Sequence, residues 1–161
     1  MRVPTYICIV KLEEAIKTTN FSSYKQKAGL NILYTAWWIK TVFSKALKGC
    51  ELTHEQFNVM RILKGKHPEV MCVKDIGSRM IERNSNVPRI IDKLVSKQFV
   101  NRTTSTVDKR ETVVGLTATG LEVLEKANTE VVKLFDTGLP ISEEEALTLS
   151  ELLESFRHKE H

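Results

Sequence analysis

Apolar residues recur along most of the chain with helical spacing, and they predict a mainly helical protein. A short helix over Lys11–Lys17 is predicted to precede a long helix from Tyr24 to Lys48 that ends at Gly49. The long helix is apolar on more of its circumference than a one-sided surface helix needs. We therefore expect it to pack on two partners, and a second subunit is one candidate.

Capping and breaking residues predict further helices in the middle of the chain. Thr53 followed by Gln56 forms a capping box, which marks a helix start. Pro88 is expected in the first turn of a helix, where backbone N–H groups have no intrahelical partner. The predicted elements are a helix ending near Gly65, a short helix over Val73–Met80, a turn at Glu82–Ser85 and a helix over Asn86–Gln98.

The spacing of apolar residues then changes from helical to β-like. Phe99–Thr104 and Thr112–Leu116 are rich in β-branched residues, and they flank the polar segment Ser105–Glu111. This pattern predicts a β-hairpin with a long, charged tip. The order of helix, short helix, turn, longer helix and hairpin predicts a helix-turn-helix followed by a wing.

Two helices are predicted after the hairpin. Thr119 and Glu122 are expected to cap a helix over Leu121–Phe135, and Ser142 with Glu145 is expected to cap the last one. The last helix carries a coiled-coil-like apolar stripe made of Leu149, Leu152, Leu153 and Phe156.

Composition points to a folded cytoplasmic protein without a prosthetic group. The hydrophobic fraction of 42% is enough for a core, and the chain lacks both an export signal and the about 20 apolar residues that span a bilayer. Its three cysteines, Cys8, Cys50 and Cys72, form no Cys-x-x-Cys pair, and no His-Glu-x-x-His motif occurs. We therefore expect no disulfide framework, no metal site and no cofactor.

Positive charge is concentrated in one third of the chain. Residues 61–110 hold 12 Lys/Arg and 5 Asp/Glu, whereas the remainder holds 12 Lys/Arg and 15 Asp/Glu. A basic cluster on a globular domain is typical of a polyanion site. A merely soluble basic surface explains the charge equally well, so the placement of the cations must decide.

The predicted longer helix carries polar side chains suited to reading base edges. Ser85, Asn86 and Arg89 lie near its start, and Lys93 and Lys97 continue a basic edge at spacings of four. Asn and Arg form bidentate hydrogen bonds with adenine and guanine in the major groove. In isolation these residues are better explained as a solvated helix face, but the adjoining hairpin favours DNA reading.

The hairpin tip strengthens this interpretation. Its residues Asp108, Lys109 and Arg110 include no glycine, although a tip that only turns prefers Asn-Gly or Asp-Gly. We expect Asp108 to hold Arg110 through a charge-assisted hydrogen bond, with Arg102 on the incoming strand. A cationic hairpin beside a reading helix can reach the minor groove, and a charged surface loop is the alternative.

Four segments together resemble a known family: Asn86–Leu94, Phe99–Arg102, the Asp108–Arg110 tip and Leu116–Gly120. In this order they are similar to the DNA-binding core of the MarR (multiple-antibiotic-resistance regulator) family, whose motifs include Asp-x-Arg at the wing and Leu-Thr-x-x-Gly after it. The resemblance covers about residues 25–156. It implies a winged-helix dimer with interlocked terminal helices, often with a small-molecule pocket between the dimer and DNA lobes.

The resemblance also implies roles for individual residues. Arg89 is expected in the major groove and Arg110 in the minor groove, with Asp108 orienting the wing and Arg102 contacting the DNA backbone or bracing the wing. The full set of expected DNA-binding residues is Lys74, Ser85, Asn86, Pro88, Arg89, Lys93, Arg102, Asp108, Lys109 and Arg110.

Two positions depart from the family pattern. Pro88 stands where Ser or Thr is frequent, which removes a hydroxyl from the reading surface, and Phe99 stands where Gly is frequent. These departures affect the expected base preference rather than the expected fold.

The predicted fold is mainly α with a small β-wing, a winged helix-turn-helix with N- and C-terminal dimerisation helices. The expected divisions are a loosely ordered leader (1–10), N-terminal dimerisation helices (11–52), a winged-helix DNA-binding domain (53–119) and C-terminal dimerisation helices (120–161). The expected function is sequence-specific transcriptional regulation by a homodimer on a pseudo-palindromic duplex operator, as a repressor relieved by a small-molecule effector.

Other functions are weighed against this one. A winged-helix protein-interaction module without DNA binding is the main alternative, and the basic segment argues against it. An enzyme is not expected, because the sequence offers no nucleophile–base pair, no phosphate-cradling glycine loop and no metal-ligand spacing.

Effector and redox sites are less strongly indicated. Tyr34, Trp37 and Trp38 are candidates for an effector pocket, although core and dimer packing is the favoured explanation for each. Cys8 is a candidate peroxide-sensing thiol, since some relatives use an N-terminal cysteine, but Lys11 is its only neighbouring cation in sequence. Cys50 and Cys72 are expected to be small packing residues.

Overall fold

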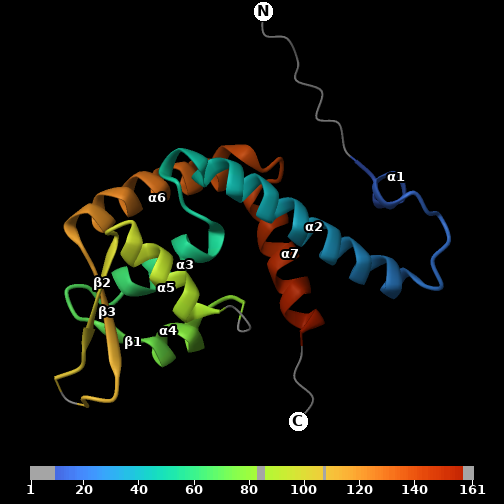
Figure 1. Cartoon of the computed structure of the whole chain (residues 1–161). Coiled ribbons are helices and arrows are strands. Elements are labelled where there is room, and N and C mark those ends of the chain that lie inside the picture. The colour runs from blue at the N-terminus through green and yellow to red at the C-terminus, as the bar shows by residue number, and fades with distance from the viewer. Residues whose placement is uncertain (1–9, 83–85, 107, 158–161) are drawn as a thin grey trace, which may run out of the picture.

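A computed structural model describes residues 10–82, 86–106 and 108–157, and it confirms the mainly helical winged helix-turn-helix fold (Figure 1). Residues 1–9 of the predicted leader lie outside this described part. The elements in chain order are α1 (Leu12–Ile16), α2 (Tyr24–Leu47), the 3-10 helix η1 (Lys48–Cys50), α3 (His54–Lys64), β1 (Met71–Cys72), α4 (Val73–Arg79), α5 (Val87–Ser96), β2 (Val100–Thr104), β3 (Thr112–Leu116), α6 (Ala118–Gly138) and α7 (Glu143–Phe156).

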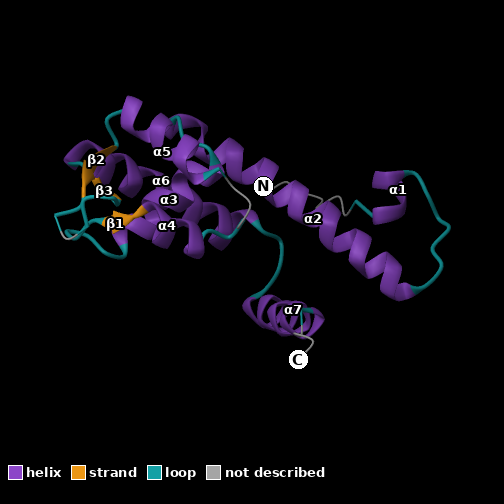
Figure 2. Ribbon diagram, turned by 60° about the horizontal axis from the view of Figure 1, so that its bottom comes forward, coloured by secondary structure: helices purple, strands orange, loops and turns teal. Residues whose placement is uncertain are grey.

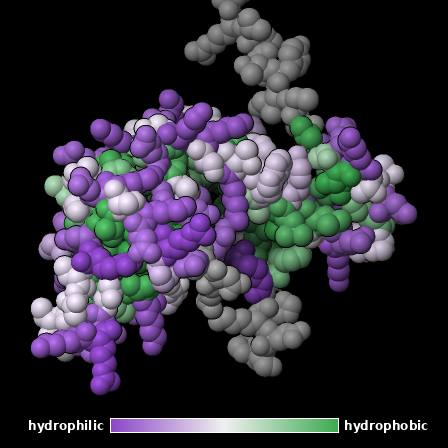
Figure 3. Space-filling view, in the orientation of Figure 1, coloured by the Kyte–Doolittle hydropathy of each residue, from purple (hydrophilic) through white to green (hydrophobic). Residues whose placement is uncertain are grey.

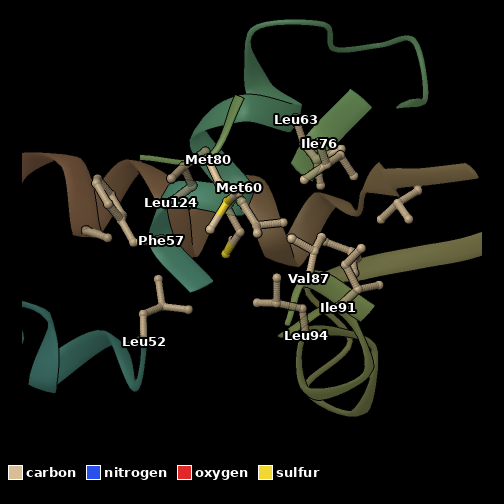
Figure 4. Close-up of a cluster of buried hydrophobic side chains, with 14 of the residues drawn as sticks. Leu52, Phe57, Met60, Leu63, Ile76, Met80, Val87, Ile91, Leu94 and Leu124 are labelled. Carbon is tan, nitrogen blue, oxygen red and sulfur yellow. The ribbon is translucent and has the colours of Figure 1, made fainter. Parts of the chain in front are cut away.

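Elements α3 to β3 form a winged-helix lobe around one apolar core. Each helix of the lobe contributes its apolar face, because residues three and four apart share a face. Leu47 of α2 and Leu124 of α6 extend the same core, so both long helices are anchored to the lobe. Figure 4 shows this cluster, whose fully buried members are Leu47, Val59, Met60, Leu63, Ile76, Ile91, Leu94, Val114 and Leu124.

The sheet is small and antiparallel, with the strand order β1-β3-β2. Strands β2 and β3 pair from Val100 opposite Leu116 out to Thr104 opposite Thr112, which confirms the predicted hairpin. Strand β1 was not predicted, because two residues are too few to show an alternating pattern. Strand β1 pairs with Val113 and Val114, so it holds β3 on the side opposite β2, close to the start of the strand.

Both predicted capping boxes are present. Thr53 Oγ1 accepts a hydrogen bond from Gln56 N at 3.3 Å, and Gln56 Oε1 accepts from Thr53 N at 3.2 Å. Ser142 and Glu145 make the same reciprocal pair at the start of α7. Hydrogen bonds from Ser142 hold the pKa of the Glu145 carboxyl below its ordinary value. Pro88 lies in the first turn of α5, as predicted.

The start of α6 differs from the prediction. Thr117, and not Thr119, is the N-cap, and its Oγ1 accepts from Gly120 N at 2.9 Å. The Thr117 hydroxyl also donates to the carbonyl oxygen of Gln98 at 2.7 Å. A Cβ atom on Gly120 would lie 1.9 Å from the Phe99 carbonyl oxygen. The helix therefore starts where a tertiary contact with the α5–β2 turn requires it, which local capping signals do not reveal.

The predicted end of the long helix is also corrected. Helix α2 continues into η1 through Gly49, which does not adopt a left-handed conformation, and the chain turns at Glu51 with φ of 54°. Glu51 is thus a non-glycine residue in the left-handed region, where such residues are uncommon.

The helices outside the lobe bury little of their apolar surface. Within the described residues, α2 buries only Phe43 and Leu47, and α7 buries none. Helix α1 lies at the far end of α2, and α7 stands apart from the lobe (Figure 2). Apolar side chains gather on the surface over the free part of α2 (Figure 3). No helix within the described ranges combines the length and apolar character needed to cross a membrane.

Candidate nucleic-acid interface

Helix α5 presents a polar face because its opposite face is buried. Val87, Ile91 and Leu94 point into the core, which leaves Arg89 and Lys93 exposed. Asn86 is the N-cap, and its Oδ1 accepts a hydrogen bond from Arg89 N at 3.3 Å. The cap occupies the Asn86 oxygen, so the amide NH₂ is the part left to contact a base. Ser85, also predicted to contact DNA, lies outside the described residues.

Lys97 does not continue the predicted basic edge. Although it follows Lys93 by four residues, it is half-buried, and its ammonium group donates to the Glu51 carbonyl oxygen. It also lies 3.5 Å from Gln56 Oε1. The free basic edge of α5 is therefore limited to Arg89 and Lys93.

The wing tip is organised by Asp108, whose carboxylate holds Arg110 through a charge-assisted hydrogen bond, as predicted. Its Oδ1 accepts a hydrogen bond from the backbone N–H of Arg110 at 2.9 Å, and no contact with the Arg110 guanidinium is seen among the described residues. The Asp108 N–H donates to Ser105 Oγ at 3.2 Å, and its carbonyl accepts from Glu111 N at 2.9 Å. Lys109 and Arg110 are exposed, so the tip offers two cations to solvent.

An ion pair ties the wing to α5. Arg102 Nη2 on β2 lies 2.8 Å from Asp92 Oδ1 on the exposed face of α5. Because Arg102 is a strand residue and Asp92 a helix residue, the pair holds the hairpin at a set position beside the helix. The sequence interpretation did not single out Asp92, although it lies inside the segment that resembles the family.

One hollow is bordered by the starts of α4 and α5 and by the hairpin. A hollow of about 340 Å³ is lined by Lys74 of α4, Pro88 of α5, and Arg102 and Glu111 of the hairpin. Arg89 and Arg110, the two predicted groove-binding arginines, are exposed and are the chain neighbours of the lining residues Pro88 and Glu111. The exposed ammonium group of Lys74 adds a third cation at this surface.

A second, larger cavity of about 640 Å³ lies between α2, α3 and α6. Its apolar wall includes Phe43, Phe57 and Phe135. Its polar lining includes Lys40, Glu82, Arg61, Asn128 and His54. Lys40 Nζ pairs with Glu82 Oε1 at 2.5 Å, and Arg61 Nη1 donates to Asn128 Oδ1 at 2.8 Å.

The predicted effector aromatics do not line this cavity. Tyr34 and Trp37 pack on each other with ring centroids 5.5 Å apart, and Trp37 is 59% exposed in a single chain. Trp38 is exposed on the same helix. The cavity is instead lined by later turns of α2, through Ala36, Ile39, Lys40 and Phe43. A repeating apolar pattern gives the faces of a helix but not which turn meets a cavity.

The two described cysteines both have contacts with the lobe. Cys72 Sγ accepts from Asp75 N at 3.4 Å as the cap of α4, and Cys50 is half-buried against the core. Cys8 lies outside the described residues. No group of three or more His, Cys, Asp or Glu residues that could hold a metal occurs among the residues described.

Comparison with known proteins agrees with this geometry. Residues 52–112 match the model of the MarR family. A MarR transcription factor from Planctomyces limnophilus is 28% identical, with a TM-score of 0.63 over 86% of this chain and 96% of that one. A search of proteins with curated functions returned no match.

Two further solved structures share the fold. A MarR-like transcription regulator from Bacillus cereus has 20% identity and a TM-score of 0.73 over 83% of this chain and 96% of that one. A mutant of MarR from E. coli, complexed with operator DNA, has 21% identity and a TM-score of 0.76 over 87% of this chain and 100% of that one. The family-model match and the fold therefore make this chain similar to winged helix-turn-helix transcriptional regulators of the MarR family, with the family match confined to residues 52–112.

Proposed function

We propose that this protein regulates transcription by binding duplex DNA, with α5 in the major groove and the wing in the neighbouring minor groove. The observation that carries the proposal is that the start of α5 and the hairpin line one hollow, are joined by the Arg102–Asp92 ion pair, and carry the exposed Arg89 and Arg110. Exposed arginines on a helix start and on a hairpin tip suit base edges and a narrow groove, respectively. The E. coli MarR mutant solved with operator DNA has the same fold, which supports duplex-DNA binding by this protein.

The proposed contacts divide into two kinds. Arg89, Asn86 and Pro88 at the start of α5 contact bases, while Lys74 and Lys93 contact phosphates. In the wing, Arg110 and Lys109 enter or flank the minor groove, Asp108 sets the tip conformation and Arg102 braces the hairpin. Ser85 completes the proposed set.

The protein is proposed to act as a homodimer. Helix α7 has a capping box and 14 residues, yet buries none of them in a single chain. Its stripe includes Leu152, which is 64% exposed, and α2 leaves Trp37 and Leu33 exposed as well. Large apolar surfaces on the terminal helices indicate a protein interface. We therefore assign residues 11–52 and 120–161 to dimerisation, residues 53–119 to DNA binding, and residues 1–10 to a leader.

A small-molecule effector is proposed to relieve repression by the dimer. The 640 Å³ cavity supports this part, because it lies where α2 meets the lobe and combines aromatic walls with Lys40, Glu82 and Arg61. A mainly apolar molecule with one polar group fits this lining. Occupation that separates Lys40 from Glu82 would loosen the contact between the dimer helices and the segment before α5.

The decisive experiment is the selection of bound duplexes from a random pool at fixed salt. A two-fold dimer is expected to select a pseudo-palindrome with half-site centres about 10 base pairs apart. Recovery of single, unpaired sites would contradict dimeric reading. Failure of the protein to bind any duplex at low salt would instead favour a winged-helix protein-interaction module. A screen for small molecules that release the selected duplex then tests the effector.

A further inference from the structure

The last turn of α5 is tied to the end of the long helix α2 by one lysine. The ammonium group of Lys97 donates to the Glu51 carbonyl oxygen, and it lies 3.5 Å from Gln56 Oε1. Lys97 is half-buried, whereas Lys93, one turn earlier on the same helix, is exposed. Two lysines at helical spacing therefore have different surroundings, and only Lys93 is available to a phosphate.

The Glu51 carbonyl that accepts this contact lies where α2 and η1 lead into α3, so the contact can fix the angle between α5 and these helices. Glu51 ends η1, the continuation of α2, and its left-handed backbone turns the chain toward α3. Gln56 is 3% exposed and belongs to the capping box that starts α3. The carbonyl end of a helix carries partial negative charge, so a cation is stabilised there. Lys97 thus joins α5 to the rigid junction of α2 and α3.

Helix α5 and the wing are joined to each other independently. The Arg102–Asp92 pair, at 2.8 Å, connects β2 to the middle of α5. Within the described residues, two sets of polar contacts connect α2 and η1 to the α4–α5 segment: the Lys97 contacts and the Lys40–Glu82 pair. Lys97 is the one that acts on α5 itself, since Glu82 precedes the helix.

We propose that Lys97 is a positioning residue that sets the angle between α5 and the dimerisation helices, and thereby selects the half-site separation that the dimer binds. This inference rests on the proposed function. One added base pair moves a half-site by about 3.4 Å and turns it by about a tenth of a helical turn. A dimer with firmly held α5 helices rejects such a duplex, whereas one with loosened helices accepts it.

The test measures affinity on a series of duplexes. The half-sites selected by the wild-type protein are kept, and their separation is changed by one or two base pairs in either direction. The wild type, Lys97→Met, Lys97→Arg and Lys93→Met are compared, with Lys48→Met as a control that removes an exposed charge from η1. Methionine keeps an unbranched stem but removes the ammonium group. Thermal unfolding of each variant is measured in parallel.

The wild type is expected to prefer its best separation over its neighbours by about tenfold, and Lys97→Met is expected to reduce that preference to about threefold or less. Lys97→Arg, which can still donate to Glu51, should restore it. Lys93→Met should lower affinity equally at every separation, and Lys48→Met should change neither quantity.

The proposal is overturned if Lys97→Met keeps the wild-type preference, or if it loses affinity equally at every separation as Lys93→Met does. If Lys97→Met does not fold, Lys97→Gln serves in its place, and failure of both to fold would make Lys97 a stability residue and overturn the proposal. These outcomes leave the proposed DNA binding intact. Absence of any duplex binding by the wild type would overturn both proposals.

Discussion

The winged-helix lobe and the terminal helices α1, α2 and α7 use apolar residues in opposite ways. The lobe encloses its large side chains, so that Met60, Ile76 and Ile91 are fully buried within one chain. The terminal helices leave comparable side chains, such as Trp37 and Leu152, facing solvent. Burial of apolar area stabilises whichever state achieves it. The lobe therefore carries its own stability, while the terminal helices leave apolar faces that the proposed dimer would bury.

The largest expected effect concerns the lobe alone. Gly120→Ala places a Cβ atom 1.9 Å from the Phe99 carbonyl oxygen, which belongs to the backbone and cannot turn away. We expect the substitution to lower the free energy of unfolding by about 4 kcal/mol or more, enough to unfold a marginally stable lobe. Chemical denaturation measured by circular dichroism checks this value.

Gly49→Ala is the matched control, because nothing lies within 4 Å of a Cβ atom at Gly49. The free energy of unfolding of Gly49→Ala should equal that of the wild type or be slightly higher, since alanine has fewer unfolded conformations than glycine. Equal stability of Gly120→Ala and the wild type would show that α6 can shift away from the α5–β2 turn.

The next effect concerns the terminal helices. Leu152→Glu puts a carboxylate into the apolar stripe of α7, which a two-fold dimer contains twice. Losing two buried leucines costs about 3 kcal/mol or more, so the dimer dissociation constant should rise at least about a hundredfold. Sedimentation at several concentrations measures this change.

Ser150→Glu adds the same charge to the same helix beside the stripe, and it should leave the dimer intact. The lobe of Leu152→Glu should keep its own circular-dichroism spectrum and buried core. Loss of the lobe's structure together with the dimer would mean that the lobe also needs the second chain for its stability.

Local signals in the sequence predicted much of the fold, whereas contacts between residues far apart in the chain could not be predicted from it. The Thr53–Gln56 capping box was predicted because both partners lie within one helical turn. The Thr117 cap of α6 was missed because its position depends on the carbonyl of Phe99, 18 residues away. Strand β1 was missed because its length gives no pattern.

The candidate site shows the same division. Arg89, Lys93 and the wing tip followed from spacing and composition, and the structure places them on one lobe. The predicted charge-assisted hydrogen bond between Asp108 and Arg110 is present, and it joins the Arg110 backbone N–H because a short aspartate side chain readily bonds the N–H two residues on. The inward turn of Lys97 could not be predicted, since its acceptor is a carbonyl 46 residues away.

A third and smaller effect separates two roles within the lobe's exposed surface. Arg89→Ala should cost about 1–3 kcal/mol at its own base pair and relax the base preference there. Arg110→Ala should weaken binding to all sequences and reduce the salt slope of the binding constant by about 1. Titrations on matched and mismatched duplexes over a salt series distinguish them.

Lys126→Ala is the control for this pair, because Lys126 is exposed on α6, away from the hairpin and α5. Its affinity and salt slope should equal those of the wild type. An unchanged salt slope for Arg110→Ala would remove the wing tip from the proposed interface.

The smallest expected effect on stability comes from placing glycine at a left-handed backbone position, once in the lobe and once after α1. Gln98, just after α5, and Lys17, just after α1, both have left-handed backbones, with φ of 60° and 53°. Glycine adopts this conformation without the strain a Cβ atom causes, so Gln98→Gly should raise the unfolding free energy by up to about 1 kcal/mol. Lys17→Gly should relieve the same strain without shifting the lobe's unfolding midpoint, because α1 packs at the far end of α2 and not on the lobe's core.

Denaturant unfolding followed by a lobe-specific amide-exchange signal measures both variants. An equal gain from Lys17→Gly would show that α1 unfolds together with the lobe, and the two regions would then share one stability.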